Sequence, residues 1–140
     1  QLTMAQQVPL AGAVIVSTPQ DLALIDARKG LNMFRKVDVP VLGIVENMST
    51  FICPHCGSAT DIFAHGGAQS EAKRLGVPFL GEVPLTLAIR ETSDAGKPVV
   101  VSAPSSPAAE AYRVIASRAW AELERDKKSA RAAPRIVMES

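Results

Sequence analysis

The segment that most constrains the fold of this chain is residues 41–56, VLGIVENMSTFICPHC. Its first part is apolar and rich in β-branched residues, which is typical of a strand buried on both faces. Glu46 and Asn47 follow at the expected carboxyl end of that strand, and Cys53 and Cys56 lie in a polar loop beyond it. Ligands of parallel α/β sheets bind off the carboxyl ends of the strands. The segment therefore predicts a binding site beside a core strand.

Strands and amphipathic helices alternate along the rest of the chain. Two further strands are predicted at residues 12–17 and 77–83, with a turn at 57–61 and a short edge strand at 62–63. Helices are predicted over residues 2–7, 19–36, 68–75, 86–92 and from 107 onward. This order predicts an α/β fold in which right-handed crossovers build a parallel sheet with helices on both faces.

Two hydroxyl residues are expected to begin helices. Thr18 precedes Pro19 and Asp21, which is the order of an N-cap, a first helical residue and an acidic first turn. Ser106 stands in the same position before Pro107. Both side chains are predicted to accept a hydrogen bond from the first turn of the helix that follows.

Length and charge restrict the class of protein. The 140 residues suffice for one domain, which we assign to residues 1–126, and the basic, aperiodic residues 127–140 are expected to form a disordered tail. A net charge of +1 argues against a nucleic-acid-binding protein. No apolar run reaches the roughly 18–20 residues of a membrane helix. Without a signal-peptide pattern, the expected location is the cytoplasm.

The two cysteines are candidate metal ligands. Cys53 and Cys56 are separated by two residues, so both thiolates can reach one soft metal centre. Zinc and iron–sulfur centres usually need four ligands, and the chain has no second pair. His55 and His65 could complete a Cys2His2 site from this one loop, although they lack the usual histidine spacing. A second copy of the loop, related by a two-fold axis, is the simpler way to complete the set.

Two alternatives to metal binding remain open for this pair. The thiols can be surface residues without a ligand. Cys-Pro-His-Cys is also an active-site sequence of oxidising thioredoxin-fold proteins, whose first thiol is acidic. Such a pair begins a long helix, whereas residues 57–61 are not helical in pattern and residues 47–50 form a polar link before it.

A nucleotide contact is the second candidate site. The amide of Asn47 can donate and accept at once, which suits the edge of a base, although an Asx-turn at the strand exit is the simpler interpretation. No GxxxxGK[ST] run occurs in the 140 residues, and Gly96-Lys97 is followed by Pro98. These residues therefore supply no cradle for a triphosphate.

Three blocks of sequence resemble one family. VSTPQDLALIDARKGLNMFRKVDVPVLGIVENMSTFICPHCG, IFAHGGA and GVPFLGEVPLTLAIRETSDAGKPVV are similar to the carboxyl half of the Mrp/ApbC-type iron–sulfur cluster carriers. These carriers are ATPases of the MinD-like deviant P-loop class. The resemblance covers residues 1–101, and its ENMS…CPHCG block is specific. It implies a three-layer Rossmann-like sheet and a cytoplasmic homodimer that transfers its cluster to apo iron–sulfur proteins.

The resemblance also implies roles for single residues. Cys53 and Cys56 of two subunits would bridge one 4Fe–4S cluster. Asn47 would border the adenine of a bound nucleotide. The same nucleotide-binding role is implied for the segment of Val83, Pro84 and Leu85.

The family's P-loop, switch segments and catalytic aspartate would lie upstream of Gln1. The chain is therefore expected to be a carboxyl-terminal fragment that does not hydrolyse ATP alone, with ATP and Mg²⁺ belonging to the full-length protein. Ala64 replaces a usual glycine, and Thr86-Leu87 replaces a more common acidic pairing. A thiol–disulfide oxidoreductase and an inactive structural remnant are the alternative functions.

Overall fold

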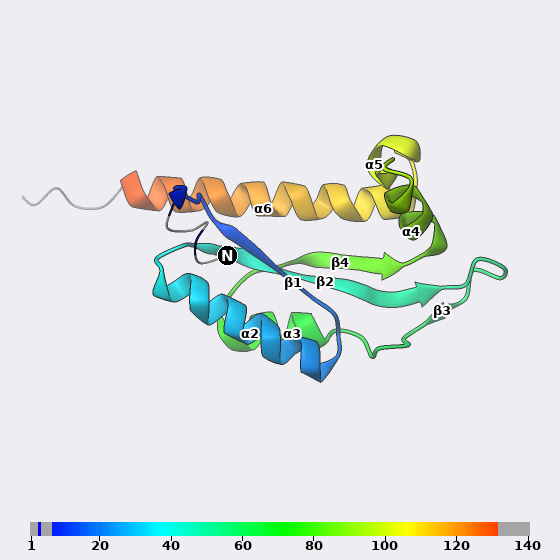
Figure 1. Cartoon of the computed structure of the whole chain (residues 1–140), viewed down its shortest axis with the longest axis horizontal. Helices are drawn as coiled ribbons and strands as arrows, with labels where there is room; N and C mark the ends of the chain where they lie inside the picture. Colours follow the sequence, from blue (N-terminus) through cyan, green and yellow to red (C-terminus); the bar gives the residue numbers. More distant parts are fainter. Residues whose placement is uncertain (1–2, 4–6, 132–140) are drawn as a thin grey trace, which may run out of the picture.

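The computed structural model describes residue 3 and residues 7–131, with side chains described up to residue 126. The elements follow one another along the chain with strands and helices interleaved (Figure 1). They are β1 (Ala13–Ser17), α2 (Asp21–Lys36), β2 (Val41–Ile52), β3 (Ala59–Thr60), α3 (Gly67–Leu75), β4 (Phe79–Leu85), α4 (Leu87–Asp94), α5 (Val99–Ser102) and α6 (Pro107–Arg131). The predicted α/β class is confirmed.

The sheet is built around β2. β1 and β4 flank β2 and run parallel to it, so that Ile44 lies opposite both Ile15 and Phe79. The predicted parallel sheet is therefore found in β1, β2 and β4. The short β3 pairs antiparallel with the far end of β2, through Phe51–Thr60 and Ile52–Ala59.

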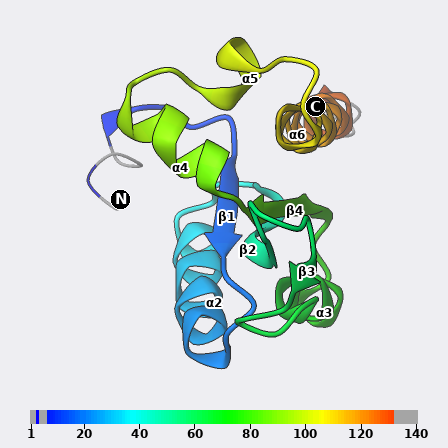
Figure 2. The same ribbon diagram turned by 90° about the vertical axis from the view of Figure 1, so that its right-hand side faces the viewer.

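Helices cover both faces of this sheet. α2 and α3 lie on one face and α6 lies on the other, which gives the predicted three layers (Figures 1 and 2). Ile44 belongs to the core under α2 and α3, whereas its neighbour Val45 packs on the opposite side near Ile115 of α6. Successive side chains of a strand point to opposite faces. Burial of both neighbours explains why this part of β2 is continuously apolar.

The two predicted helix caps have different outcomes. Thr18 is not an N-cap, because α2 begins at Asp21 and its cap residue is Gln20, whose side chain makes no cap hydrogen bond. The Thr18 hydroxyl instead donates to Oε1 of Gln20 at 3.2 Å. The prediction for Ser106 is confirmed, since its Oγ accepts from the backbone N–H of Ala109 at 3.2 Å.

Several boundaries differ from the predicted ones. The edge strand predicted at residues 62–63 is wrong: β3 occupies Ala59–Thr60 inside the predicted turn, and Ile62 makes only an isolated bridge to Ala64. β4 begins at Phe79 and ends at Leu85, two residues later at each end than predicted. α6 continues to Arg131, into the segment expected to be a disordered tail.

Two predicted segments are described only in part. Most of the helix predicted at residues 2–7 and all of residues 132–140 lie outside the described residues. Among the described residues, no helix is both long and apolar enough to cross a membrane.

Candidate functional site

A hairpin extends from the carboxyl end of the sheet and carries both cysteines. β2 runs past its neighbours and returns as β3, so the turn projects from one end of the molecule (Figure 1). The polar link predicted at residues 47–50 is thus part of β2. Met48 has a φ of 55°, and the register of β2 with β4 shifts between Asn47 and Phe51. This irregularity marks the base of the hairpin.

Backbone hydrogen bonds close the cysteine turn. The N–H of Cys53 donates to the carbonyl of Ser58 at 2.9 Å, and the N–H of Gly57 donates to the carbonyl of Cys53 at 2.9 Å. Gly57 has a φ of +71°, a conformation that a residue without Cβ adopts readily. Both thiols are therefore carried by one tight turn.

The thiols of this turn are free and accessible. Cys56 is exposed and Cys53 is half-buried. The pKa of Cys56 is lowered by hydrogen bonds, first from the side chain of Ser58, then from the backbone of Ser58 and from the side chain of Cys53. Sγ of Cys56 lies 3.1 Å from Oγ of Ser58. A lowered pKa favours the thiolate, which is the form that binds metals. The donor set suits a soft metal centre, but it supplies two ligands of the usual four.

The thioredoxin-type interpretation is not favoured. Residues after Cys56 lead into β3, and the next helix, α3, begins only at Gly67. The thiol pair therefore does not lie at a helix N-terminus, where oxidising pairs of that kind obtain their acidity.

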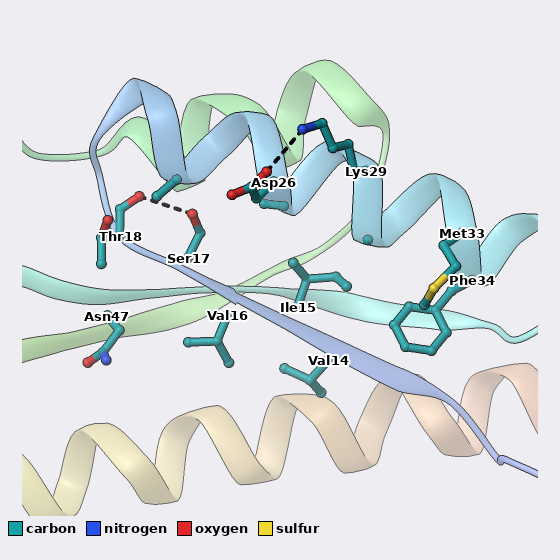
Figure 3. A pocket seen from close by; sticks show the side chains of 13 residues that line it. Val14, Ile15, Val16, Ser17, Thr18, Asp26, Lys29, Met33, Phe34 and Asn47 are labelled. Atoms are coloured by element: carbon teal, nitrogen blue, oxygen red, sulfur yellow. Dashed lines mark hydrogen bonds and ion pairs between the residues drawn. The ribbon is translucent and has the colours of Figure 1, made fainter. Parts of the chain in front are cut away.

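Asn47 lies inside β2, opposite Val83 of β4. Its Oδ1 accepts from the backbone N–H of the next residue, Met48, at 3.0 Å, whereas an Asx-turn would use the N–H two residues on. The same side chain borders an open hollow of about 890 Å³ between β1 and α2, together with Ser17 and Thr18 (Figure 3). The structure thus places Asn47 at one end of a cavity.

The other predicted nucleotide residues do not line this hollow. Val83 is buried against α6, and Pro84 and Leu85 are half-buried at the end of β4. The described residues that line the hollow belong to β1, α2 and the loop between them, together with Asn47. Asn47 and the Val83–Leu85 segment are neighbours through strand pairing rather than through a shared cavity.

Sequence reasoning missed two polar clusters. Glu46 and Glu82 are paired in the middle of β2 and β4, and His65, from the segment before α3, lies beside them. The second cluster is centred on Glu71 of α3, which is 5% exposed and accepts hydrogen bonds from Arg28 and Arg74. These contacts, above all the hydrogen bond from Arg28, lower the pKa of Glu71. The first cluster joins three separate elements, so no sequence spacing indicates it. In the second, the i,i+3 spacing of Glu71 and Arg74 on α3 is a usable signal, whereas Arg28 comes from α2.

Comparison with known proteins identifies the family. Residues 1–120 match the family described as "ParA: NUBPL iron-transfer P-loop NTPase". The chain belongs to this family. The predicted membership in the iron–sulfur carrier group of MinD-like P-loop NTPases is thereby confirmed.

Curated relatives of this iron-transfer family share more than half of the aligned residues. An iron–sulfur cluster transfer protein of Dictyostelium discoideum is 58% identical over 123 residues, which are 88% of this chain and 38% of the relative. An iron–sulfur cluster carrier protein of Escherichia coli is 53% identical over 123 residues, or 88% of this chain and 33% of the relative. The chain spans about two fifths of the length of the first of these curated relatives and a third of the second.

Solved structures support the Rossmann-like fold of the family. A nucleotide-binding protein of Archaeoglobus fulgidus in complex with ADP is 41% identical, with a TM-score of 0.54 over 62% of this chain and 36% of that chain. The cell-division ATPase MinD of Pyrococcus furiosus is 27% identical, with a TM-score of 0.59 over 82% of this chain and 43% of that chain.

Proposed function

We propose that the cysteine hairpin binds an iron–sulfur cluster as cargo and passes it to apo iron–sulfur proteins. The observation that carries this proposal is the position of two free thiols, Cys53 and Cys56, in one turn at the end of a projecting hairpin. An accessible turn lets acceptor thiolates approach the cluster and replace its ligands. Relatives named as cluster carriers or cluster transfer proteins support the same role.

The cargo is a 4Fe–4S cluster held between two chains. Each chain supplies two thiolates, and a 4Fe–4S cluster takes four. A hairpin at the edge of the molecule can meet its symmetry-related copy without disturbing the core of either sheet. The functional unit is therefore a homodimer with the cluster on its two-fold axis.

A nucleotide is the second ligand of this proposal. Asn47 and the adjacent Val83–Leu85 segment border the adenine. The phosphates are bound by a P-loop, which these 140 residues do not contain. ATP hydrolysis and the Mg²⁺ that it needs belong to the full-length members of the family. The role assigned to the residues of this chain is to hold and deliver the cluster.

Anaerobic reconstitution with ferrous iron and sulfide tests the cluster. The parent chain should hold about two iron atoms per chain and migrate as a dimer, as one 4Fe–4S cluster per pair requires. Cys53→Ser and Cys56→Ser should lose the bound iron. His55→Ala is the matched control, since it changes a residue of the same turn that is not part of the ligand set.

The same preparation tests delivery. Loaded protein should restore the absorption spectrum of an apo-ferredoxin-type acceptor, and the Cys56→Ser variant should not. Iron content that is equal in the serine variants and the parent would refute the ligand assignment. A fully loaded chain that remains a monomer would refute the shared cluster.

A further inference from the structure

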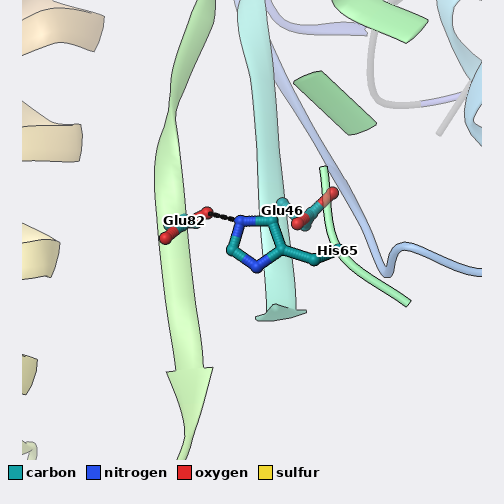
Figure 4. Close-up of side chains that lie close together, drawn as sticks. All are labelled: Glu46, His65 and Glu82. Carbon is teal, nitrogen blue, oxygen red and sulfur yellow. Dashed lines mark ion pairs between the residues drawn. The ribbon is translucent and has the colours of Figure 1, made fainter. Parts of the chain in front are cut away.

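We propose that Glu46, His65 and Glu82 form a second metal site, for one divalent transition-metal ion such as Zn²⁺ or Fe²⁺. The three side chains come from β2, from the segment before α3 and from β4, and the imidazole lies between the carboxylates (Figure 4). One potential ligand atom from each lies within 4.8 Å of the other two. None of these residues belongs to the cysteine turn, so the site does not depend on the proposed cluster.

Hydrogen bonding around His65 indicates which ring nitrogen is free for a metal. The hydroxyl of Thr50 donates its single proton to Oδ1 of Asp61 at 2.9 Å. Oγ1 of Thr50 lies 3.0 Å from Nδ1 of His65, and because its own proton is already donated, Nδ1 must be the donor in that contact. In a neutral ring, Nε2 then carries the lone pair.

That lone pair faces a carboxylate. Nε2 of His65 lies 3.1 Å from Oε2 of Glu82. Two acceptors at this distance repel one another unless a cation, either a proton or a metal ion, binds between them. A metal-bound histidine commonly donates its other ring N–H to an oxygen acceptor that fixes the ring, and Thr50 with Asp61 provides this arrangement here.

Burial of Glu46 favours the metal ion. Its side chain is 0% exposed, and its two oxygens each accept one backbone N–H, from Gly66 at 3.0 Å and Ala68 at 2.7 Å. Within residues 7–126, no lysine, arginine or histidine forms an ion pair with this carboxylate. Each carboxylate oxygen keeps a further lone pair, and buried charges are normally paired or bound to metals.

The ligand chemistry selects the class of ion. One imidazole and two carboxylates suit zinc and ferrous iron, whereas calcium and magnesium prefer oxygen ligands alone. A bound ion would join β2 and β4 to His65, in the segment that returns from the cysteine hairpin. The site would therefore anchor the returning arm of that hairpin to the sheet.

Zinc titration of the Cys53→Ser/Cys56→Ser variant tests this site, because the double substitution removes the thiols as competing ligands. Calorimetry should show about one Zn²⁺ per chain. Adding His65→Ala or Glu82→Gln should weaken binding by at least about tenfold. Adding His55→Ala, the control, should leave the affinity unchanged. With His55 and His65 the only histidines in the sequence, zinc should shift the NMR signals of His65 alone.

Two results would overturn the proposal. One is the absence of stoichiometric zinc binding in the double serine variant. The other is zinc binding that survives both His65→Ala and Glu82→Gln unchanged. Circular dichroism verifies that each variant is folded, and if His65→Ala unfolds, Glu82→Gln decides the question because Glu82 is partly exposed.

Discussion

Replacing Glu71 by glutamine should destabilise the fold near neutral pH. Its buried carboxylate accepts from Nε and Nη2 of Arg28 at 2.5 and 3.1 Å and from both Nε and Nη2 of Arg74. An amide keeps one acceptor oxygen but turns an NH₂ group toward two guanidinium donors. These contacts tie α2 to α3 across the surface of the core.

The size of the effect follows from the exposure of the partners. A hydrogen bond to a charged group contributes roughly 1.5–3 kcal/mol. The side chains of Arg28 and Arg74 are 39% and 57% exposed, so water screens them and can solvate them after the substitution. We therefore expect a loss of about 2 kcal/mol in the free energy of unfolding. With a urea m-value of about 1–3 kcal/mol/M, the unfolding midpoint should fall by about 1 M.

Acidification should remove the difference between Glu71→Gln and the parent chain. The folded-state pKa of Glu71 is lowered from its ordinary value of 4.5, so its stabilisation is fully present above that pH. It is lost as the pH falls through the lowered pKa. Urea unfolding of the parent chain and of Glu71→Gln, at neutral and at acidic pH, measures this difference in stability.

The control for this experiment is Glu91→Gln, because Glu91 is an exposed carboxylate 3.9 Å from Arg90. That substitution should change stability by no more than about 0.5 kcal/mol. The reasoning is refuted if Glu71→Gln is as stable as the parent at neutral pH, or if its deficit persists in acid.

Replacement of glycine by alanine should have opposite effects on stability at two positions. Gly43→Ala should destabilise by about 3 kcal/mol, because a Cβ there would lie 2.6 Å from the carbonyl oxygen of Pro78 and 2.7 Å from Leu80, at a φ of +154°. Gly30→Ala should stabilise by about 1 kcal/mol, because it improves helix propensity inside α2 and its Cβ would lie 3.8 Å from Cδ1 of Ile15. Urea midpoints measure both. A tolerated Gly43→Ala would contradict the close approach of β2 to the β4 segment, and a destabilising Gly30→Ala would contradict the free space beside α2.

The core of the fold could be predicted because its elements follow simple periodicities. Ile44 and Val45 are apolar neighbours, which indicated burial on both faces, and the structure places a helix layer over each. Leu24, Ala27 and Leu31 fall three and four residues apart, the spacing of one face of a helix, and all three are buried on the inner face of α2. These patterns are local, so one stretch of sequence contains the whole signal.

The end of β2 could not be predicted for a physical reason. Residues 47–50 resemble a polar loop, yet they belong to β2, where Ser49 is buried and its hydroxyl donates to the carbonyl of Val83 at 3.4 Å. Likewise, Glu46 and Glu82 meet only through the register of β2 with β4. Residues that meet only because two separate elements pack together have no characteristic spacing in the sequence.

The cysteine turn is closed by its own hydrogen bonds, and Met48 lies much nearer the sheet, with its left-handed backbone at the base of the hairpin. The turn therefore holds the two cysteines near one another, and Met48 lies outside the turn at an irregular point of the strand that leads to it. A rotation there would re-aim both thiols together without changing their spacing. In the proposed function, holding the cluster and orienting it would therefore depend on different parts of the same hairpin.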